Sequence, residues 1–375
     1  MNPTNQTILL TIDVEDWFQV ENFKKCIPFS SWPDCELRVE KNVHKLLDLL
    51  DSIELNNPIN PRLPQTSSKA SLQPPLIFLT AVQQHGNTKE PSPQSSDLSL
   101  SAMPSASSGL SSSPPTSRLT PNGSIEATFF VLGWIAQRLP HLIREIQARG
   151  HEVASHGYDH VLCREQSAED LKHDLSKSKK LLEDITGRSV YGYRAPGFSI
   201  SRDILSLVEE AGYLYDSSFN SFKLNKRYGQ IELKPNHGNG ILHKISESFY
   251  EVPISNVRIG GKVVPWGGGG YFRLFPLKLF KQGVQSILKK QGAYLFYMHP
   301  WEIDPDQPSV KGVPFTFRMR HYVNMGSTFL KLSAFLEGFK NYQYRTCHQY
   351  LLNHHRAKEA NLLRQIQKGR GEAAS

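Results

Sequence analysis

The sequence has no long hydrophobic run. No window approaches the roughly 18 consecutive apolar residues that identify a membrane-spanning helix. The N-terminus also lacks the basic stretch, apolar stretch and small-residue cleavage site of a secretory signal peptide. We therefore expect a cytoplasmic protein with no membrane span, for which any membrane association would be peripheral.

Cysteine is scarce, with 4 residues in a chain of 375. Cys26, Cys35, Cys163 and Cys347 are too far apart to form a C-x-x-C zinc or redox motif. A disulfide framework is typical of much smaller secreted domains. We expect reduced thiols that pack as small apolar side chains.

The chain also lacks a single block of positive charge, although 43 Lys and Arg against 35 Asp and Glu give a net charge of +8. This charge favours contact with anionic surfaces or polymers. However, the basic residues are spread along the chain, and part of the excess lies in a basic tail at 356–375. We therefore predict no nucleic-acid partner.

One long segment contains little that could form a core. Residues 56–122 are dominated by Ser, Pro, Thr, Gln and Asn, as in "SPQSSDLSLSAMPSASSGLSSSPPTS". Such a segment cannot bury enough apolar surface to offset the entropy of ordering it. Structureless loops of this length are rare inside compact domains. We predict a disordered surface insertion at 56–122 that interrupts one domain formed by 1–55 and 123–300.

Strand and helix patterns alternate on both sides of this segment. Leucines at i, i+3 and i+4 spacing predict an amphipathic helix over 42–55. Further along, the sequence predicts strands at 127–133, 151–156, 190–196 and 213–219, and helices at 135–150, 167–187 and 201–212. This alternation indicates an α/β protein with a mostly parallel sheet, either open or closed into a barrel.

Three apolar strands end in groups that can carry chemistry. They are "LLTIDVED" at 9–16, "EVASHGYDH" at 152–160 and "AYLFYMHP" at 293–300. The carboxyl ends of parallel strands meet at one face, where the active sites of α/β folds are built. On a helical turn His156 and His160 would share a face, and a carboxylate from the first strand would complete a His₂–carboxylate metal site.

These pieces resemble, in order, the motifs of the polysaccharide deacetylase family, which is carbohydrate esterase family 4. The matching stretches are "TIDVED", "ATFFVLG", "SHGYDH", "YRAPGFS" and "LFYMHP", and they extend from about Ile8 to Pro300 outside the insertion. The resemblance implies a distorted (β/α) barrel and an enzyme that removes acetyl groups from sugars with a divalent metal.

Two stretches are similar to one branch of that family. "TIDVEDWFQV" and "HPWEIDPDQP" resemble bacterial deacetylases associated with exopolysaccharide and exosortase gene clusters, and "RHYVNMGSTFLKLSAFLEGF" resembles their C-terminal extension. This implies an extension at 301–355 that packs on the barrel. It also implies an acetylated polysaccharide or oligosaccharide, an exopolysaccharide or its precursor, as the substrate. The oligomeric state stays open.

The resemblance assigns roles to the acids of the first strand. Asp13 corresponds to the general base. Val14 stands where most members have the metal-binding acid, whereas related branches use an acid-x-acid pattern that selects Glu15. Side chains two apart on a strand share a face, which supports Glu15 as the metal ligand. Asp16 remains the alternative, because the strand could already have ended there.

The later motifs supply the remaining roles. His299 corresponds to the general acid that protonates the departing amine, and Arg194 to the arginine that orients the base. We expect Asp216 to orient the imidazole of His299. For Arg194 and Asp216, an ordinary buried ion pair or strand-end hydrogen bonds remain the structural alternative. Ser217 stands where the family usually has an aromatic side chain that forms a wall of the sugar groove.

Two other stretches resemble ligand-binding motifs but lack residues that those motifs require. The run "PWGGGG" at 265–270 lacks the Lys-Ser/Thr pair of a phosphate-binding P-loop, so we expect a mobile loop that faces the substrate, or plain turn material. "HPWEIDPDQP" at 299–308 carries alternating acids but lacks the glycine and terminal glutamate of an EF-hand calcium loop.

The sequence is compatible with three functions. The first is an N-acetyl-sugar deacetylase that holds a divalent metal, for which zinc is the best match, on Glu15, His156 and His160. The second is a related amidohydrolase acting on a small cyclic amide or ureide. The third is a non-catalytic carbohydrate-binding protein. A binding protein would not need both a base and an acid beside a metal site, so the sequence favours the first.

Overall fold

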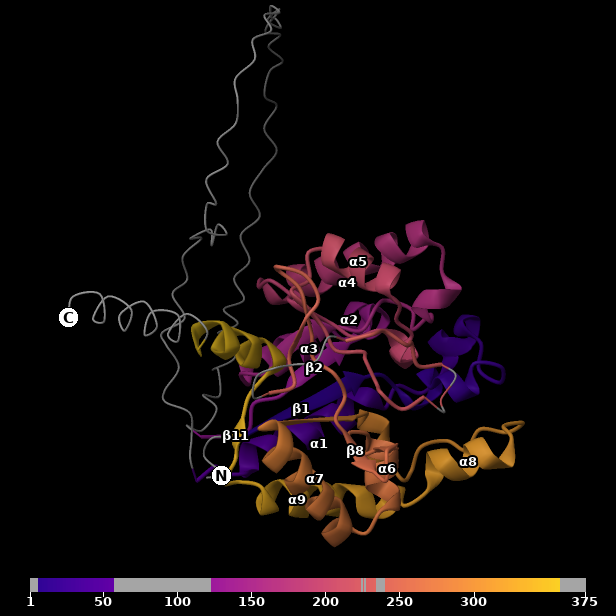
Figure 1. Cartoon of the computed structure of the whole chain (residues 1–375). Coiled ribbons are helices and arrows are strands. Elements are labelled where there is room, and N and C mark those ends of the chain that lie inside the picture. Colours follow the sequence, from indigo (N-terminus) through magenta and orange to yellow (C-terminus); the bar gives the residue numbers. More distant parts are fainter. Residues whose placement is uncertain (1–5, 57–122, 224, 226, 234–239, 358–375) are drawn as a thin grey trace, which may run out of the picture. The chain divides into compact units, whose positions relative to one another are not determined.

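A curled, mainly parallel β-sheet lies at the centre of the protein (Figure 1). The computed structural model describes residues 6–56, 123–223, 225, 227–233 and 240–357, which fall within one compact unit. The predicted insertion at 56–122 lies outside the described residues except for Asn56, and so does nearly all of the predicted tail.

Strand β1 (Thr7–Val14) pairs with three other strands. It runs parallel to β10 (Ala293–Met298) on one side and to β2 (Thr128–Val131) on the other. Near its beginning it also pairs in parallel with β11 (Gln343–Tyr344). All 8 residues of β1 are buried. The near-continuous apolar sequence of β1 reflects this burial on both faces.

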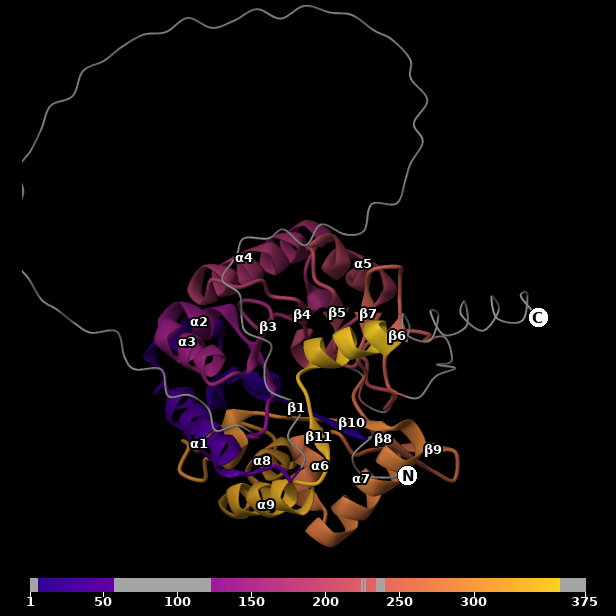
Figure 2. The ribbon, with the colours of Figure 1, turned by 90° about the vertical axis from the view of Figure 1, so that its left-hand side faces the viewer.

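The rest of the sheet follows the order of the chain. The strand order is β10-β1-β2-β3-β4-β5-β7-β6, and only β6 is antiparallel to its neighbour. The bounds of the strands beyond β2 are β3 (Glu152–Ser155), β4 (Gly192–Tyr193), β5 (Tyr215–Asp216), β6 (His243–Lys244) and β7 (Tyr250–Glu251). Figure 2 shows the strands curving around a common centre. The predicted distorted (β/α) barrel is confirmed.

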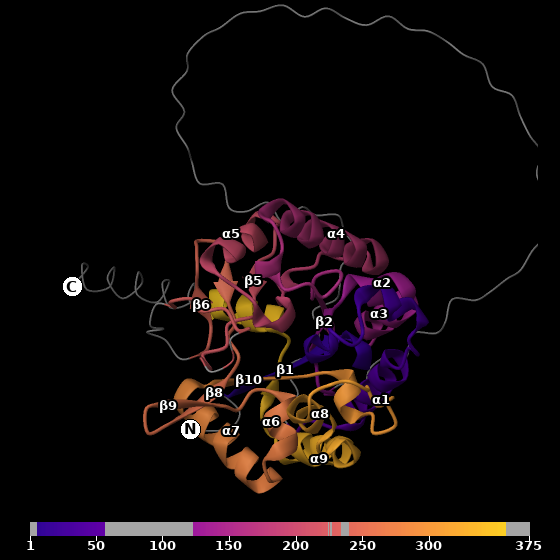
Figure 3. The same ribbon diagram turned by 90° about the vertical axis from the view of Figure 1, so that its right-hand side faces the viewer.

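Helices cover the outer face of this sheet. Views from opposite sides both show α4 and α5 beyond one part of the sheet, and α7 and α9 beyond another (Figures 2 and 3). The helices are α1 (Val39–Ser52), α2 (Gly133–Arg138), α3 (Pro140–Ala148), α4 (Ala168–Thr186), α5 (Arg202–Glu210), α6 (Gly269–Leu274), α7 (Leu277–Gln291), α8 (Phe315–Tyr322) and α9 (Met325–Gly338). None of the helices in the described part of the chain has the length and apolar character that a bilayer crossing needs.

The single helix predicted over 135–150 is wrong. The structure has two helices there, α2 and α3, which meet at Leu139, whose φ and ψ are −124° and 55°. Pro140 begins α3, where its missing N–H costs nothing. The same proline disfavours a helical backbone at the residue before it, so the first helix ends at that point.

Alternation along β1 divides its side chains between two apolar clusters. Ile8, Leu10, Ile12 and Val14 join the larger cluster, which includes the buried faces of the surrounding helices. Leu9 instead packs in a second cluster with residues of β2, β3 and β10 and with the helical segment that follows β11. Because side chains alternate along a strand, Asp13 lies on the same face as Leu9. The strand thus carries a carboxylate to the inner face of the sheet.

The C-terminal segment contributes α8, α9 and β11. The pairing of β11 with β1 attaches this segment to the sheet. The boundary predicted at residue 301 stays a prediction, as does the division of the chain at 355.

Candidate active site

Asp13 and Arg194 form a buried ion pair at the carboxyl ends of β1 and β4. Nη1 of Arg194 donates to Oδ1 of Asp13 at 2.6 Å and to Oγ1 of Thr11 at 2.8 Å. Asp13 is 1% exposed and Arg194 is fully buried. The charge-assisted hydrogen bond from the guanidinium holds the carboxylate of Asp13 in a fixed position.

The other two nitrogens of the Arg194 guanidinium also donate hydrogen bonds. Nε donates to the carbonyl oxygen of Ser217 and Nη2 to its hydroxyl, both at 2.8 Å. The guanidinium carbon lies 4.0 Å from the ring centre of Phe130. Ser217, which stands where an aromatic residue was expected, therefore fixes the arginine that holds Asp13.

Glu15, His156 and His160 form a buried three-residue cluster. One side-chain ligand atom from each residue lies within 4.8 Å of the other two. Nδ1 of His156 donates to the carbonyl oxygen of Arg194 at 2.7 Å, because a carbonyl can only accept. This bond leaves Nε2 of His156 as the nitrogen with a free lone pair, which is the form that binds a metal.

The donor atoms of this cluster fit a divalent metal. Oε2 of Glu15 lies 3.1 Å from Nε2 of His160, yet Oε2 is buried with no hydrogen-bond partner in the described part of the chain. Burial lowers the pKa of His156, and it lowers that of His160 to about 4, so both rings are neutral at neutral pH. Burial alone would raise the pKa of Glu15, but His160 and His299 outweigh it and hold that pKa at about 2. All three residues are therefore in the protonation state of metal ligands.

The two histidines meet through a loop, not through the helical turn predicted for them. His156 directly follows β3, and His160 has a positive φ of 56°. The backbone N–H of Tyr158 donates to Oδ1 of Asp174 in α4 at 3.0 Å, which holds the loop between them. The ring centres of the two histidines lie 5.4 Å apart.

Asp16 lies away from this cluster. Its Oδ2 accepts the backbone N–H groups of Arg38 at 2.6 Å and Val39 at 2.8 Å, and its Oδ1 accepts that of Trp17 at 2.8 Å. Asp16 thus connects the end of β1 to the beginning of α1. Of the two acids that the sequence left open, the structure brings Glu15 to the histidines.

His299 follows β10 and faces both acids of the first strand. Its Nε2 lies 3.0 Å from Oε1 of Glu15 and 3.9 Å from Oδ2 of Asp13, and its side chain is 18% exposed. Its Nδ1 donates to Oε1 of Glu302 at 2.8 Å. Burial would lower the pKa of His299, but Glu15 and Glu302 raise it well above the usual value. His299 is therefore protonated at neutral pH and can give up a proton.

Sequence reasoning missed Glu302 and Arg273. Glu302 is 1% exposed, and its Oε2 accepts from Nε of Arg273 in α6 at 2.8 Å. A Cβ atom at Gly269 would collide with the carboxylate of Glu302, which is held in place by Arg273, so only glycine fits there. The glycine run at 265–270 thus leads into α6 and makes room for this ion pair. One sequence feature could have identified Glu302: it stands three residues after His299, at the start of a helical turn, where a carboxylate can reach back to the first residue.

The predicted pairing of Asp216 with His299 is wrong. Asp216 in β5 accepts from the backbone N–H of Ser218 at 2.9 Å and from its hydroxyl at 2.8 Å. Its other close neighbour is Glu251 in β7, and burial raises the pKa of both acids. The hydroxyl of Ser218 accepts the N–H of Ala195, next to Arg194. Asp216 therefore supports the loop that carries the arginine, while Glu302 orients the histidine.

Comparison with known families agrees with this arrangement. Residues 119–215, which include both histidines of the cluster and Arg194, match the family described as polysaccharide deacetylase. This segment of the chain belongs to the polysaccharide deacetylase family. Residues 217–352 match a domain of unknown function, DUF3473, which includes His299, Glu302 and Arg273. The predicted exopolysaccharide branch stays a prediction.

Named relatives match only part of the chain. Over 88 residues it is 34% identical to a peptidoglycan-N-acetylglucosamine deacetylase of Bacillus cereus, which covers 24% of this chain and 41% of that protein. Over 87 residues it is 36% identical to a chitooligosaccharide deacetylase of Azorhizobium caulinodans. This match covers 23% of this chain and 41% of that protein. The chain thus spans less than half the length of these relatives. The structure of peptidoglycan deacetylase PdaC from Bacillus subtilis aligns with a TM-score of 0.41 and 12% identity, over 97% of this chain and 98% of that one.

Proposed function

We propose that this protein is a metal-dependent hydrolase that removes N-acetyl groups from sugars of a bacterial polysaccharide, an exopolysaccharide or its precursor. One observation carries the proposal. A carboxylate fixed by Arg194 and a protonated imidazole fixed by Glu302 lie beside one buried cluster of three metal-ligand side chains. Amide hydrolysis needs this combination of a base, an acid and an electrophile.

The electrophile would be a divalent ion held by Glu15, His156 and His160. Two imidazoles and one carboxylate suit zinc, as in other catalytic sites with three protein ligands. When bound there, such an ion supplies Lewis acidity toward the acetyl carbonyl. Zinc is the proposed metal, because nitrogen-rich ligand sets favour it over magnesium or calcium.

Asp13 would act as the general base. Its Oδ1 is occupied by Arg194, which leaves Oδ2 to take a proton from the attacking water. Water supplies the oxygen that forms the new bond to the acetyl carbon, and the proton moves to Asp13. Thr11 and Arg194 keep the carboxylate in position through this step.

His299 would act as the general acid. The carbon–nitrogen bond breaks as Nε2 of His299 gives its proton to the departing sugar nitrogen, since an amide anion is too poor a leaving group. Acetate and a free amino sugar are the products. Glu302 keeps the ring oriented and stabilises its positive charge before the transfer.

The test is release of acetate from N-acetylglucosamine oligomers by the purified full chain. Wild type and the control Asp16→Asn are expected to release acetate, and Asp13→Asn is expected to lose at least about 100-fold in kcat. A parallel assay offers a cyclic ureide. Turnover of the ureide without acetate release from the sugar would overturn the proposal, and so would binding of the oligomer without any turnover.

A further inference from the structure

Helix α8 presents large apolar side chains to solvent. Phe315 is 74% exposed, Met319 is 52% exposed, and Phe317 between them is 38% exposed. Phe315 and Met319 are four residues apart and therefore share one face of the helix. Phe317 lies on a different face, because residues two apart on a helix do not share one. Exposed apolar side chains that occur singly are ordinary, but Phe315 and Met319 lie side by side and together form an apolar patch.

The same segment is rich in positive charge. Lys311, Arg318 and Arg320 are exposed, and no ion pair among the described residues engages them. The sequence contains no Asp or Glu between Asp306 and Glu337. Apolar and basic side chains are thus interleaved on one short helix, with no negative charge along this stretch of the chain.

The C-terminal end of α8 is firmly attached to the body of the protein. Nη1 of Arg273 donates to the carbonyl oxygens of His321 at 2.5 Å and Val323 at 3.0 Å. The ring of His321 stacks on Trp301 with centres 4.3 Å apart and an interplanar angle of 17°. A hollow of about 420 Å³ lies against the helix, lined by Ser309, Phe315, Arg318, Met319, Tyr322 and Val323. The helix is therefore anchored at one end and exposed at the other.

We propose that α8 and the preceding Lys311 form a docking surface for an anionic lipid bilayer. Phe315 and Met319 would enter the boundary between headgroups and acyl chains. The basic side chains would contact the lipid phosphates. An apolar patch contributes buried area to such binding, and basic side chains beside it contribute attraction to anionic lipids.

The chemistry of the segment favours lipid over a glycan or a protein. Residues 310–322 contain no Asp, Glu, Asn or Gln, which are the side chains that usually bind sugar hydroxyls. A bilayer also needs no partner of matched shape, which suits a small apolar patch on one short helix. Trp301 stacks on both His321 and His299, so docking would bring the candidate active site close to the bilayer. The inference does not depend on the proposed deacetylase activity.

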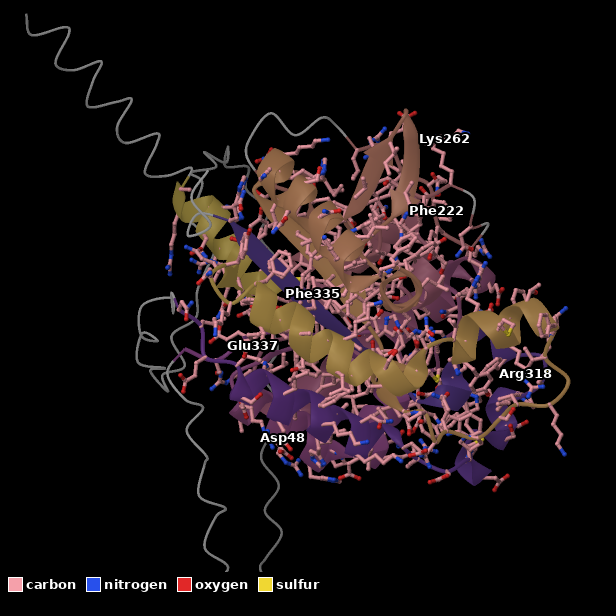
Figure 4. The ribbon with its side chains drawn as sticks, turned by 90° about the horizontal axis from the view of Figure 1, so that it is seen from below. Asp48, Phe222, Lys262, Arg318, Phe335 and Glu337 are labelled. Carbon is pink, nitrogen blue, oxygen red and sulfur yellow. The ribbon has the colours of Figure 1, made fainter. Side chains whose placement is uncertain are left out.

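The test is co-sedimentation of the full chain with vesicles. One set contains phosphatidylcholine and phosphatidylglycerol, and the other contains phosphatidylcholine alone. The test variant is Phe315→Ser with Arg318→Ser. The matched control is Ile259→Ser with Lys262→Ser, which removes one exposed apolar and one basic residue from the β8–β9 hairpin (Asn256–Ile259 and Lys262–Pro265). Figure 4 shows Lys262 and Arg318 on separate parts of the surface.

Wild type and the control are expected to bind the anionic vesicles more tightly than the neutral ones, and added salt should weaken this binding. The test variant should bind the anionic vesicles at least about tenfold more weakly. Its circular dichroism and its acetate release from soluble oligomers should match wild type. Equal vesicle binding by wild type and the test variant would overturn the proposal, as would no binding at all. A dimer present in wild type but lost in the variant would assign the patch to a second copy of the chain, and loss of soluble glycan binding would assign it to the substrate.

Discussion

Nδ1 of His299 donates to Oε1 of Glu302, three residues further along the chain, at 2.8 Å. Glu302 is in turn held by Arg273, whose Nη1 also binds the last turn of α8. All three residues lie in the segment that matches DUF3473. The orientation of the proposed acid therefore depends on a part of the chain outside the segment that matches the polysaccharide deacetylase family.

Replacing Glu302 with glutamine should slow the chemical step. Glutamine has nearly the same shape but lacks the charge that stabilises the protonated ring of His299. We expect kcat to fall by about 10- to 100-fold with little change in KM, because the ring is less well oriented and less often protonated. Steady-state acetate release measures both constants. The control Asp306→Asn removes an exposed carboxylate from the same segment and should have no effect. An unchanged kcat in Glu302→Gln would contradict the role given to this residue.

Glu15 and Asp16 should differ sharply in their effect on metal binding. Glu15→Gln removes a charged ligand, and the purified protein should retain little zinc. Asp16→Asn keeps an oxygen acceptor for the backbone of Arg38 and Val39, and it should retain about as much zinc as wild type. Elemental analysis of the two variants provides the measurement. The opposite pattern would transfer the ligand role to Asp16.

Asp174 should make the stability of the protein depend on pH. Burial raises its pKa from 3.8 to about 6, so the folded protein keeps this proton to a higher pH than the unfolded chain does. Unfolding then releases a proton between about pH 4 and about pH 6, and stability falls as the pH rises through this window.

Asp174→Asn removes the cost of ionising a buried carboxyl, and it keeps an oxygen that can accept the backbone N–H of Tyr158. We expect the variant to be more stable than wild type by about 1 to 2 kcal/mol at neutral pH, with no difference below about pH 4. Urea unfolding at several pH values measures the effect. The exposed control Asp184→Asn should stay within about 0.5 kcal/mol of wild type at every pH. A difference for Asp174→Asn that does not vary with pH would refute the explanation.

Much of the site could be predicted because it depends on local patterns. The alternation along β1 places Asp13 on the inner face, and the apolar strand that precedes each polar group locates the carboxyl end of the sheet. The same patterns predicted His156 and His299 at strand ends, where the structure has them, whereas Arg194 was selected by the family resemblance. Their catalytic and metal-binding roles stay predictions.

The partners of these residues could not be read from local patterns. Asp216 and Glu302 are both acids near a strand end, and only the packing of β5 against β7 and of α6 against β10 decides which one reaches His299. The loop between the two histidines was expected to be helical because their spacing of four fits one face of a helix. The bond from Tyr158 to Asp174 in α4, far along the chain, favours a loop instead.

The central claim is that one metal held by Glu15, His156 and His160 enables Asp13 and His299 to hydrolyse an N-acetyl group. The most direct measurement is acetate release from N-acetylglucosamine oligomers while zinc is added stepwise to metal-free protein. We predict that activity rises linearly and levels off at about one zinc ion per chain, and that His156→Ala stays inactive throughout. Acetate release at full rate without any divalent metal, or no release at any level of zinc, cobalt or nickel, would contradict the account.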